Sequence, residues 1–287
     1  ADPRIQAVGG KFGVNPFDSD PAEFDQVQVY YGATKALQWF EDKFGYDRAG
    51  AQIDIRINDY PGGRPDNAEY KPVAGRPQIL IGAGNGVISG LARDNDVVTH
   101  EFSHHIIYQR LKSARGESGV LHEGYADYFT YAMYNNPYLA ESTMPDRDYL
   151  RTAKVSENLR IDDPELPLTS HYRGQIWSAL LWQLRSTIGE SFDQVVYQSL
   201  FYLDFDSGYR DAIYGLLNAD LAQQTGLAES EDSLSPHYCQ IVEQSIRRGF
   251  ATYIEDVDGS PCGLDLLAAA QESRSYSSDK SDGSGQK

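Results

Sequence analysis

The sequence predicts an α+β fold with a small mixed α/β first lobe and a mainly α-helical second lobe. Apolar residues recur at helical spacing between residues 24 and 44, whereas residues 53–57 alternate apolar and polar side chains as a β-strand does. Helical spacing dominates the later chain, in segments at about 173–186, 191–203, 208–224 and 236–250. For a chain of 287 residues, we therefore expect lobes at 1–113 and 114–262, followed by a tail at 263–287.

Local start and stop signals define the other elements. Asp20-Pro21 favours the start of a helix, which should continue to Gly45. A loop rich in proline and glycine separates the strand at 53–57 from a second strand at 79–81. Four prolines between residues 135 and 170 predict loops and short helices. The end of the chain, rich in Ser, Asp, Gly and Lys, has too few apolar residues to fold and is predicted to be partly disordered.

The segment at 96–111 is the most informative part of the chain. It contains neither proline nor glycine, and its apolar residues recur at helical spacing, so we expect a helix. His100 and His104 are one turn apart and therefore project from the same face. Two imidazoles in that arrangement can supply two ligands of a tetrahedral zinc site. Glu101 would lie beside the metal without binding it, which suits a base for a metal-bound water.

A carboxylate further along the chain can complete this set of ligands. Glu123 follows His104 by 19 residues, which allows the first helix to end and a second helix, predicted at about 119–134, to return. Asp127 follows Glu123 by four residues and therefore shares its helix face. Since a ligating histidine usually donates its other ring N–H to a carboxylate, Asp127 is expected to orient His100. The alternative is that both carboxylates belong to a solvated acidic face.

The charge balance restricts the expected partners. Acidic residues outnumber basic ones by 42 to 25, which gives a formal net charge of −17 and a pI near 4.7. Nucleic acids and anionic membrane surfaces would be repelled, so neither is an expected partner. No apolar run approaches the ~18 residues of a membrane span, and no signal peptide is apparent. Because the chain opens at Ala1 with a polar stretch, we expect a mature form from which a leader was removed.

The histidine segment and its surroundings resemble a known family. Asp96-Val97-Val98-Thr99-His100-Glu101-Phe102-Ser103-His104, followed by Glu117-Ser118-Gly119, Glu123 and Asp127, is similar to the thermolysin group of zinc endopeptidases. His171-Tyr172-Arg173-Gly174-Gln175-Ile176-Trp177 resembles the His-x-x-Gly-x-x-Trp segment of the fungalysin branch, and the likeness covers roughly residues 20 to 252. The resemblance implies a zincin-like, two-lobe metalloprotease with one catalytic Zn²⁺ between the lobes, held by His100, His104 and Glu123.

The resemblance also implies roles for residues outside the metal site. His171 corresponds to the histidine that donates a hydrogen bond to the oxyanion, the alternative being a solvent-exposed histidine at a helix cap. Arg160 resembles the arginine that binds a substrate carbonyl, with Arg151 as its rival. The pocket for the residue after the scissile bond would be apolar and lined by Leu91, Val97 and Leu159. Calcium is possible but has no clear site, because Tyr134 falls where the thermolysin group has one of its calcium ligands.

We therefore expect a secreted, monomeric zinc endopeptidase that acts on proteins or peptides and cleaves before hydrophobic residues. Glu101 would be its general base. Since the family is usually secreted, a disulfide between Cys239 and Cys262 is favoured over two free thiols.

Two other functions are compatible with the same residues. A zinc aminopeptidase also carries H-E-x-x-H with 18 residues before the third ligand. It needs an acidic anchor in a Gly-x-Met-Glu-Asn segment, however, and neither Met133 nor Met144 stands in one. The other alternative is a non-catalytic, zinc-stabilised binding module, against which the intact Glu101 argues.

Overall fold

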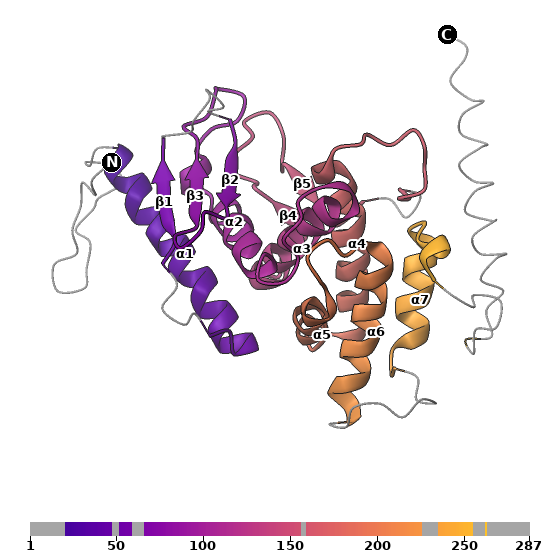
Figure 1. Cartoon of the computed structure of the whole chain (residues 1–287). Helices are drawn as coiled ribbons and strands as arrows, with labels where there is room; N and C mark the ends of the chain where they lie inside the picture. The colour runs from indigo at the N-terminus through magenta and orange to yellow at the C-terminus, as the bar shows by residue number, and fades with distance from the viewer. Residues whose placement is uncertain are drawn as a thin grey trace, which may run out of the picture. The chain divides into compact units, whose positions relative to one another are not determined.

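The computed structural model describes residues 21–47, 52–58, 66–155, 159–225, 235–254 and 262. Within them the chain forms the helices α1 (Pro21–Phe44), α2 (Asn95–Ile107), α3 (Gly116–Tyr134), α4 (Ser170–Ile188), α5 (Phe192–Ser199), α6 (Tyr209–Thr225) and α7 (Tyr238–Arg247) (Figure 1). The strands are β1 (Asp54–Ile57), β2 (Ala68–Lys71), β3 (Gln78–Ile81), β4 (Tyr138–Leu139) and β5 (Arg151–Thr152). Single 3-10 turns, η1 (Leu91–Arg93), η2 (Leu200–Tyr202) and η3 (Ala251–Tyr253), complete the described elements. This combination confirms the predicted α+β class.

The chain forms two compact units. Of the described residues, the first unit contains those up to Gln109 together with Phe129–Thr152, and the second contains Arg110–Tyr128 together with those from Ala153 onward. Helix α3 continues from one unit into the other without a break.

These units differ from the predicted lobes in two segments. Lobes were expected at 1–113 and 114–262, but residues 110–113 lie in the second unit and residues 129–152 lie in the first. The physical reason is aromatic packing in the last turns of α3, where the Phe129 ring lies 5.3 Å from that of Phe40 on α1. The predicted tail at 263–287 lies outside the described residues.

A three-stranded sheet lies in the first unit, in the order β1-β3-β2. β1 pairs with β3 in parallel, and β2 pairs with β3 in antiparallel orientation. The central strand β3 carries the consecutive apolar residues Ile79, Leu80 and Ile81, which are all buried, as expected of a strand covered on both faces. The sequence analysis missed β2 because Ala68-Glu69-Tyr70-Lys71 is a half-buried edge strand without apolar alternation.

Helix α2 is held at its N-terminus by two carboxylates. Asp94 caps the helix by accepting a hydrogen bond from the backbone N–H of Asp96 at 2.9 Å, and it also accepts one from the backbone N–H of Ser142 at 3.2 Å. Asp96 accepts a hydrogen bond from the backbone N–H of Ala140 at 3.0 Å. Burial, and secondarily the charge of Asp94, raises the pKa of Asp96 to about 7. The loop after β4 is thereby tied to the first turn of the helix that carries both histidines.

Helices α3 and α4 approach closely in the second unit because two glycines meet at their crossing. A Cβ atom on Gly174 would lie 2.7 Å from the Cβ atom of Glu123, and one on Gly124 would lie 2.7 Å from the Cβ atom of Trp177. The Trp177 side chain is fully buried, with its ring 5.6 Å from that of Tyr125 on α3. The His-x-x-Gly-x-x-Trp segment is therefore the part of α4 that packs on α3.

The described part of the second unit also contains a disulfide and a buried ion pair. Cys239 and Cys262 are bonded, which confirms the predicted disulfide. Asp193 is fully buried and accepts hydrogen bonds from Arg185 Nε at 2.9 Å and from the Tyr128 hydroxyl at 2.6 Å, so that it links α3, α4 and α5. Among the described helices, none combines the length and the apolar character that crossing a membrane requires.

Candidate metal centre

Helix α2 presents two imidazole nitrogens to one point. His100 Nε2 and His104 Nε2 lie 3.1 Å apart, and the two rings are nearly perpendicular, with an angle of 83° between their planes. Two nitrogens at ~2.05 Å from a tetrahedral zinc ion would be separated by about 3.3 Å. The observed distance therefore fits two bonds to a single ion.

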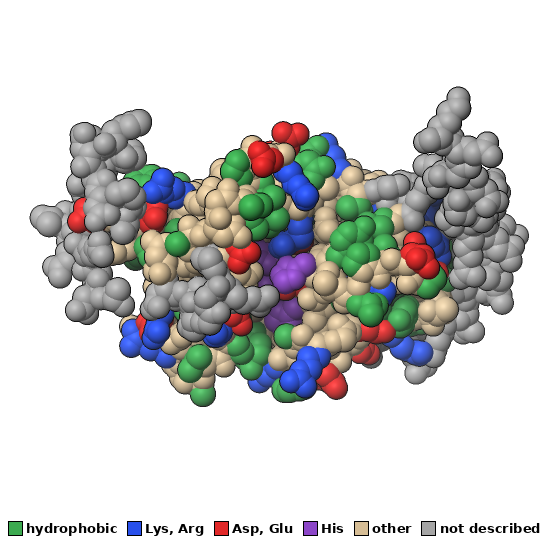
Figure 2. Space-filling view, turned by 90° about the horizontal axis from the view of Figure 1, so that it is seen from above, with side chains coloured by type: hydrophobic (Ala, Val, Ile, Leu, Met, Phe, Trp, Pro, Cys, Tyr) green, Lys and Arg blue, Asp and Glu red, His purple; other side chains and the backbone are tan. Residues whose placement is uncertain are grey.

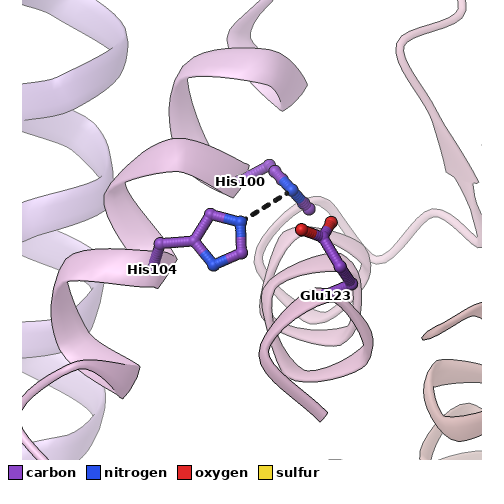
Figure 3. A group of neighbouring side chains, drawn as sticks. All are labelled: His100, His104 and Glu123. Carbon is purple, nitrogen blue, oxygen red and sulfur yellow. Dashed lines mark hydrogen bonds between the residues drawn. The ribbon is translucent and has the colours of Figure 1, made fainter. Parts of the chain in front are cut away.

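Glu123 on α3 supplies the third donor of the group. One ligand atom from each of His100, His104 and Glu123 lies within 4.8 Å of the other two (Figure 3). His100 is buried, whereas His104 and Glu123 are half-buried. Two imidazoles and one carboxylate form the donor set of catalytic zinc sites, in which a fourth position stays open. The predicted ligands are thus brought together in an arrangement that fits zinc.

The two predicted supporting carboxylates are shielded from solvent. Glu101 is 5% exposed, and Asp127, one turn after Glu123 on α3, is fully buried. The burial of Asp127 and the half-buried position of Glu123 argue against the alternative that these two carboxylates form a solvated face. The hydrogen bond from His100 to Asp127 stays a prediction.

An arginine lies beside the His100 ring. Arg151 Nη2 lies 3.4 Å from both His100 Nδ1 and His100 Nε2, so the guanidinium is within hydrogen-bonding range of either ring nitrogen. Figure 2 shows Lys or Arg side chains beside the histidine side chains on this face of the molecule. The sequence analysis considered Arg151 only as an alternative to Arg160 for binding a substrate carbonyl. Neither periodicity nor spacing in the sequence predicts that β5 lies beside α2.

His171 lies in the first turn of α4 and faces α3. Its Nε2 atom is 3.4 Å from Glu123 Oε2, and its side chain is 56% exposed. The N-cap of α4 is Thr169, whose hydroxyl accepts a hydrogen bond from the backbone N–H of Tyr172. His171 is therefore not the helix-cap residue of the alternative interpretation.

Arg160 has several partners within the second unit. It is 4% exposed, and its Nε and Nη2 atoms each donate a hydrogen bond to Asp162 at 2.9 Å. Its Nη1 atom lies 3.3 Å from the carbonyl oxygens of Ile246 and Arg247. A substrate carbonyl would have to compete with these four contacts. Substrate binding by Arg160 stays a prediction.

The residues predicted to line an apolar substrate pocket differ in exposure. Leu91 and Val97 are 4% and 6% exposed, whereas Leu159 is half-buried. Little surface of the first two is therefore available to a ligand in this conformation.

The remaining histidines near the centre make structural contacts. His105 Nε2 lies 3.3 Å from the Tyr46 hydroxyl and its Nδ1 lies 3.1 Å from the Tyr70 hydroxyl, which ties α2 to β2 and to the segment after α1. Burial lowers the pKa of His105 to about 4, so this imidazole is neutral. His122 Nε2 donates to the carbonyl oxygen of Leu111 at 2.6 Å.

Comparisons with known proteins find similar metallopeptidases and elastases. Residues 12–108 match the family described as thermolysin metallopeptidase, catalytic domain. An extracellular elastase of Staphylococcus epidermidis is 27% identical over 242 residues, which are 74% of this chain and 46% of the elastase. The extracellular elastase of Staphylococcus epidermidis strain ATCC 12228 is 26% identical over 232 residues, covering 70% of this chain and 45% of that protein. The chain thus spans slightly less than half the length of these curated relatives.

The fold has a counterpart among solved structures. The precursor of protealysin, a metalloproteinase from Serratia proteamaculans, superposes with a TM-score of 0.63 and 15% sequence identity, covering 87% of this chain and 85% of that one. At this identity the likeness establishes the shared fold. Together with the sequence matches, it confirms the resemblance to thermolysin-type metalloproteases.

Proposed function

We propose that this chain, whose sequence and fold are similar to those of thermolysin-type metalloproteases, is a zinc-dependent endopeptidase. The observation that carries the proposal is the convergence of His100, His104 and Glu123, with ligand atoms within 4.8 Å of one another. A closed structural zinc site would have four protein ligands, whereas the described residues bring three together here. The arrangement therefore favours a catalytic site.

The chemistry follows from the residues around these ligands. When bound, zinc would act as a Lewis acid that polarises water and the substrate carbonyl. Glu101, the neighbour of His100 on α2, accepts a proton from the attacking water and delivers it to the leaving amine. His171 donates a hydrogen bond to the oxyanion that develops on the carbonyl oxygen. Asp127 holds the His100 ring in the orientation that leaves Nε2 facing the metal.

The expected substrates are extracellular proteins or peptides. The similar elastases of Staphylococcus epidermidis are described as extracellular, which supports secretion, and the disulfide between Cys239 and Cys262 is compatible with an oxidising compartment. Cleavage before hydrophobic residues is the preference that we propose.

Peptide cleavage by the zinc-loaded protein tests the function. The parent should cleave an N-terminally acetylated peptide internally, and a chelator should abolish the reaction. Glu101→Gln should lower kcat by about 10²–10⁴-fold while the bound zinc stays at the parental level. Glu190→Gln is a suitable control, because this carboxylate is 70% exposed and lies outside the site.

Two outcomes would favour the other functions. Cleavage confined to peptides with a free amino terminus would indicate an aminopeptidase. Equal residual turnover in the parent and in Glu101→Gln would indicate a zinc-stabilised binding module.

A further inference from the structure

A cavity of about 180 Å³ lies in the first unit, between α1, β1 and α2 (Figure 1). Helix α1 lines it with Ala33 and Leu37, which are four residues apart and share a helix face. Ile53 and Ile55 line it from β1 and from the residue before it, since side chains two residues apart in a strand point to the same face of the sheet. Three elements that are distant in the sequence thus turn one face each toward the same space.

The cavity lies on the side of α2 away from the metal ligands. Phe102 and His105 line it from this helix. At about 100° per residue, the mean direction of these two side chains is roughly 150° around the helix from that of His100 and His104. A molecule in the cavity would therefore contact α2 behind the metal centre and would not reach the metal.

The walls of the cavity keep apolar surface that the fold leaves partly uncovered. Leu37, Ile53 and Ile55 are all half-buried, whereas the consecutive apolar residues of the central strand β3 are fully buried. Covering apolar surface is favourable in proportion to the area removed from water. A ligand with an apolar body would therefore gain free energy from contact with these three side chains.

Access to the cavity is from the surface of α1. Tyr30, which also lines it, is 59% exposed. Phe102 and His105 are each 5% exposed, so the end of the cavity at α2 is closed to solvent. A small molecule can thus enter past α1 and lose most of its contact with water at α2.

The lining favours an uncharged ligand. It contains no Asp, Glu, Lys or Arg among the described residues. The ring nitrogens of His105 lie 3.3 and 3.1 Å from the hydroxyls of Tyr46 and Tyr70, so neutral groups surround this imidazole as well. An ionised ligand would lose its hydration without gaining a counter-charge, which is unfavourable.

We propose that this cavity is a binding site for a neutral molecule with a single aromatic ring, such as a phenol. A dry cavity of about 150 Å³ lined by Leu, Ile and Phe binds benzene, so about 180 Å³ holds one ring with a small substituent. A helix, about 10 Å in diameter, is too large to enter. Apolar walls with a few polar groups, here those of Thr34 and Tyr46, are typical of small-molecule sites. The site is separate from the proposed peptidase activity.

Isothermal titration calorimetry with 4-methylphenol tests the site. A molecule of this size should bind with a Kd of about 0.1–1 mM, and 4-methylbenzoate, which carries a negative charge on the same ring, should bind at least tenfold more weakly. The Kd of 4-methylphenol should agree within twofold between the zinc-free and the zinc-loaded protein. Equal affinity for the two compounds would overturn the proposal, as would binding of 4-methylphenol by the zinc-loaded protein alone, which would place the phenol on the metal.

A variant that fills the cavity tests its location. Ala33→Leu adds a larger side chain from α1 and exchanges two good helix formers, so it should weaken the binding of 4-methylphenol at least tenfold. Gln38→Leu is the matched control, because it introduces the same side chain at an exposed position of α1 outside the lining and should bind as the parent does. An affinity of Ala33→Leu within twofold of the parent would contradict the site.

A variant that enlarges the cavity should have the opposite effect. Leu37→Ala removes part of the wall, so it should bind 2-naphthol, a phenol with two fused rings, at least tenfold more tightly than the parent does. Stronger binding cannot result from loss of the fold, which would only weaken it. A 2-naphthol affinity within twofold of the parent would overturn the assignment of the ligand to this cavity.

Discussion

Replacing Gly174 by alanine tests whether the close approach of α3 and α4 positions the third metal ligand. The added Cβ atom would lie 2.7 Å from the Cβ atom of Glu123 and 3.0 Å from the backbone nitrogen of Gly124. Carbon atoms are in favourable contact at about 3.5–4.0 Å, so the two helices would have to separate locally by ~1 Å. The neighbours are backbone and Cβ atoms rather than the end of a flexible side chain, and they cannot yield by rotation.

Two opposing terms set the size of the effect on stability. Alanine favours a helix interior over glycine by about 1 kcal/mol, whereas overpacking typically costs about 1–3 kcal/mol. We therefore expect a net loss of about 1 kcal/mol, or a decrease of about 2–4 °C in Tm. Zinc affinity should fall more clearly, by about 10–100-fold, because metal–ligand distances tolerate shifts of only ~0.2 Å.

Competition with a chromogenic chelator measures the zinc affinity directly. Gly215→Ala is a matched control, since it also adds a Cβ atom to a helix glycine, with the nearest contact at 3.1 Å to the carbonyl oxygen of Ser199. It should change stability without changing zinc affinity. Zinc affinity of Gly174→Ala within twofold of the parent would refute the reasoning that this crossing positions Glu123.

Three further predictions concern other features of the fold. His171→Ala should lower kcat by about 10²–10³-fold with little change in KM, because the lost hydrogen bond acts only on the developing oxyanion; the measurement is steady-state cleavage of an acetylated peptide. Asp96→Asn should flatten the pH dependence of stability. The folded-state pKa of Asp96 is raised to about 7, so the native state holds a proton that the unfolded state has lost, and stability falls as the pH rises from about 4 to 7. The measurement is urea unfolding at several pH values. Between about pH 4 and 7, the free energy of unfolding of the variant should fall less steeply with pH than that of the parent, by up to about 1.4 kcal/mol per pH unit. The same slope in both proteins would contradict the raised pKa of Asp96. Replacing Cys239 and Cys262 together by serine should lower the free energy of unfolding by about 3 kcal/mol, because their separation of 23 residues sets the size of the loop that is released. The parent treated with a reductant should show the same loss.

The local part of the site could be predicted from the sequence, because it depends on helix geometry alone. His100 and His104 are four residues apart on an uninterrupted helix, and that spacing allows their Nε2 atoms to lie 3.1 Å apart. The contacts that involve distant segments could not be predicted. Nothing in the sequence around Arg151 indicates that β5 lies beside α2. Nothing around Arg160 indicates that its guanidinium donates hydrogen bonds to Asp162 and to two backbone carbonyl oxygens.

The first residue of α3 also could not be predicted from the sequence. The sequence analysis placed it near Gly119, since glycine usually interrupts a helix. The structure begins the helix at Gly116, which has a positive φ of 57°. A Cβ atom on Gly119 would lie 2.7 Å from the carbonyl oxygen of Ala114, so glycine is required there by a close contact rather than by a turn. Only the packing of the preceding loop distinguishes a glycine needed for a turn from a glycine needed for a close contact.

Contacts at both ends of α2 should affect how the protein binds zinc. At the first turn, the Asp94 side chain accepts a hydrogen bond from the backbone N–H of Asp96. Near the last turn, the ring nitrogens of His105, the residue after His104, lie within hydrogen-bonding distance of the Tyr46 and Tyr70 hydroxyls. Rotation of α2 about its axis would break these contacts. We therefore expect the His100 and His104 side chains to keep the same orientation in the metal-free protein. Metal stripped by a chelator should therefore be regained on simple addition of zinc, with no refolding step and with little ordering entropy lost on uptake.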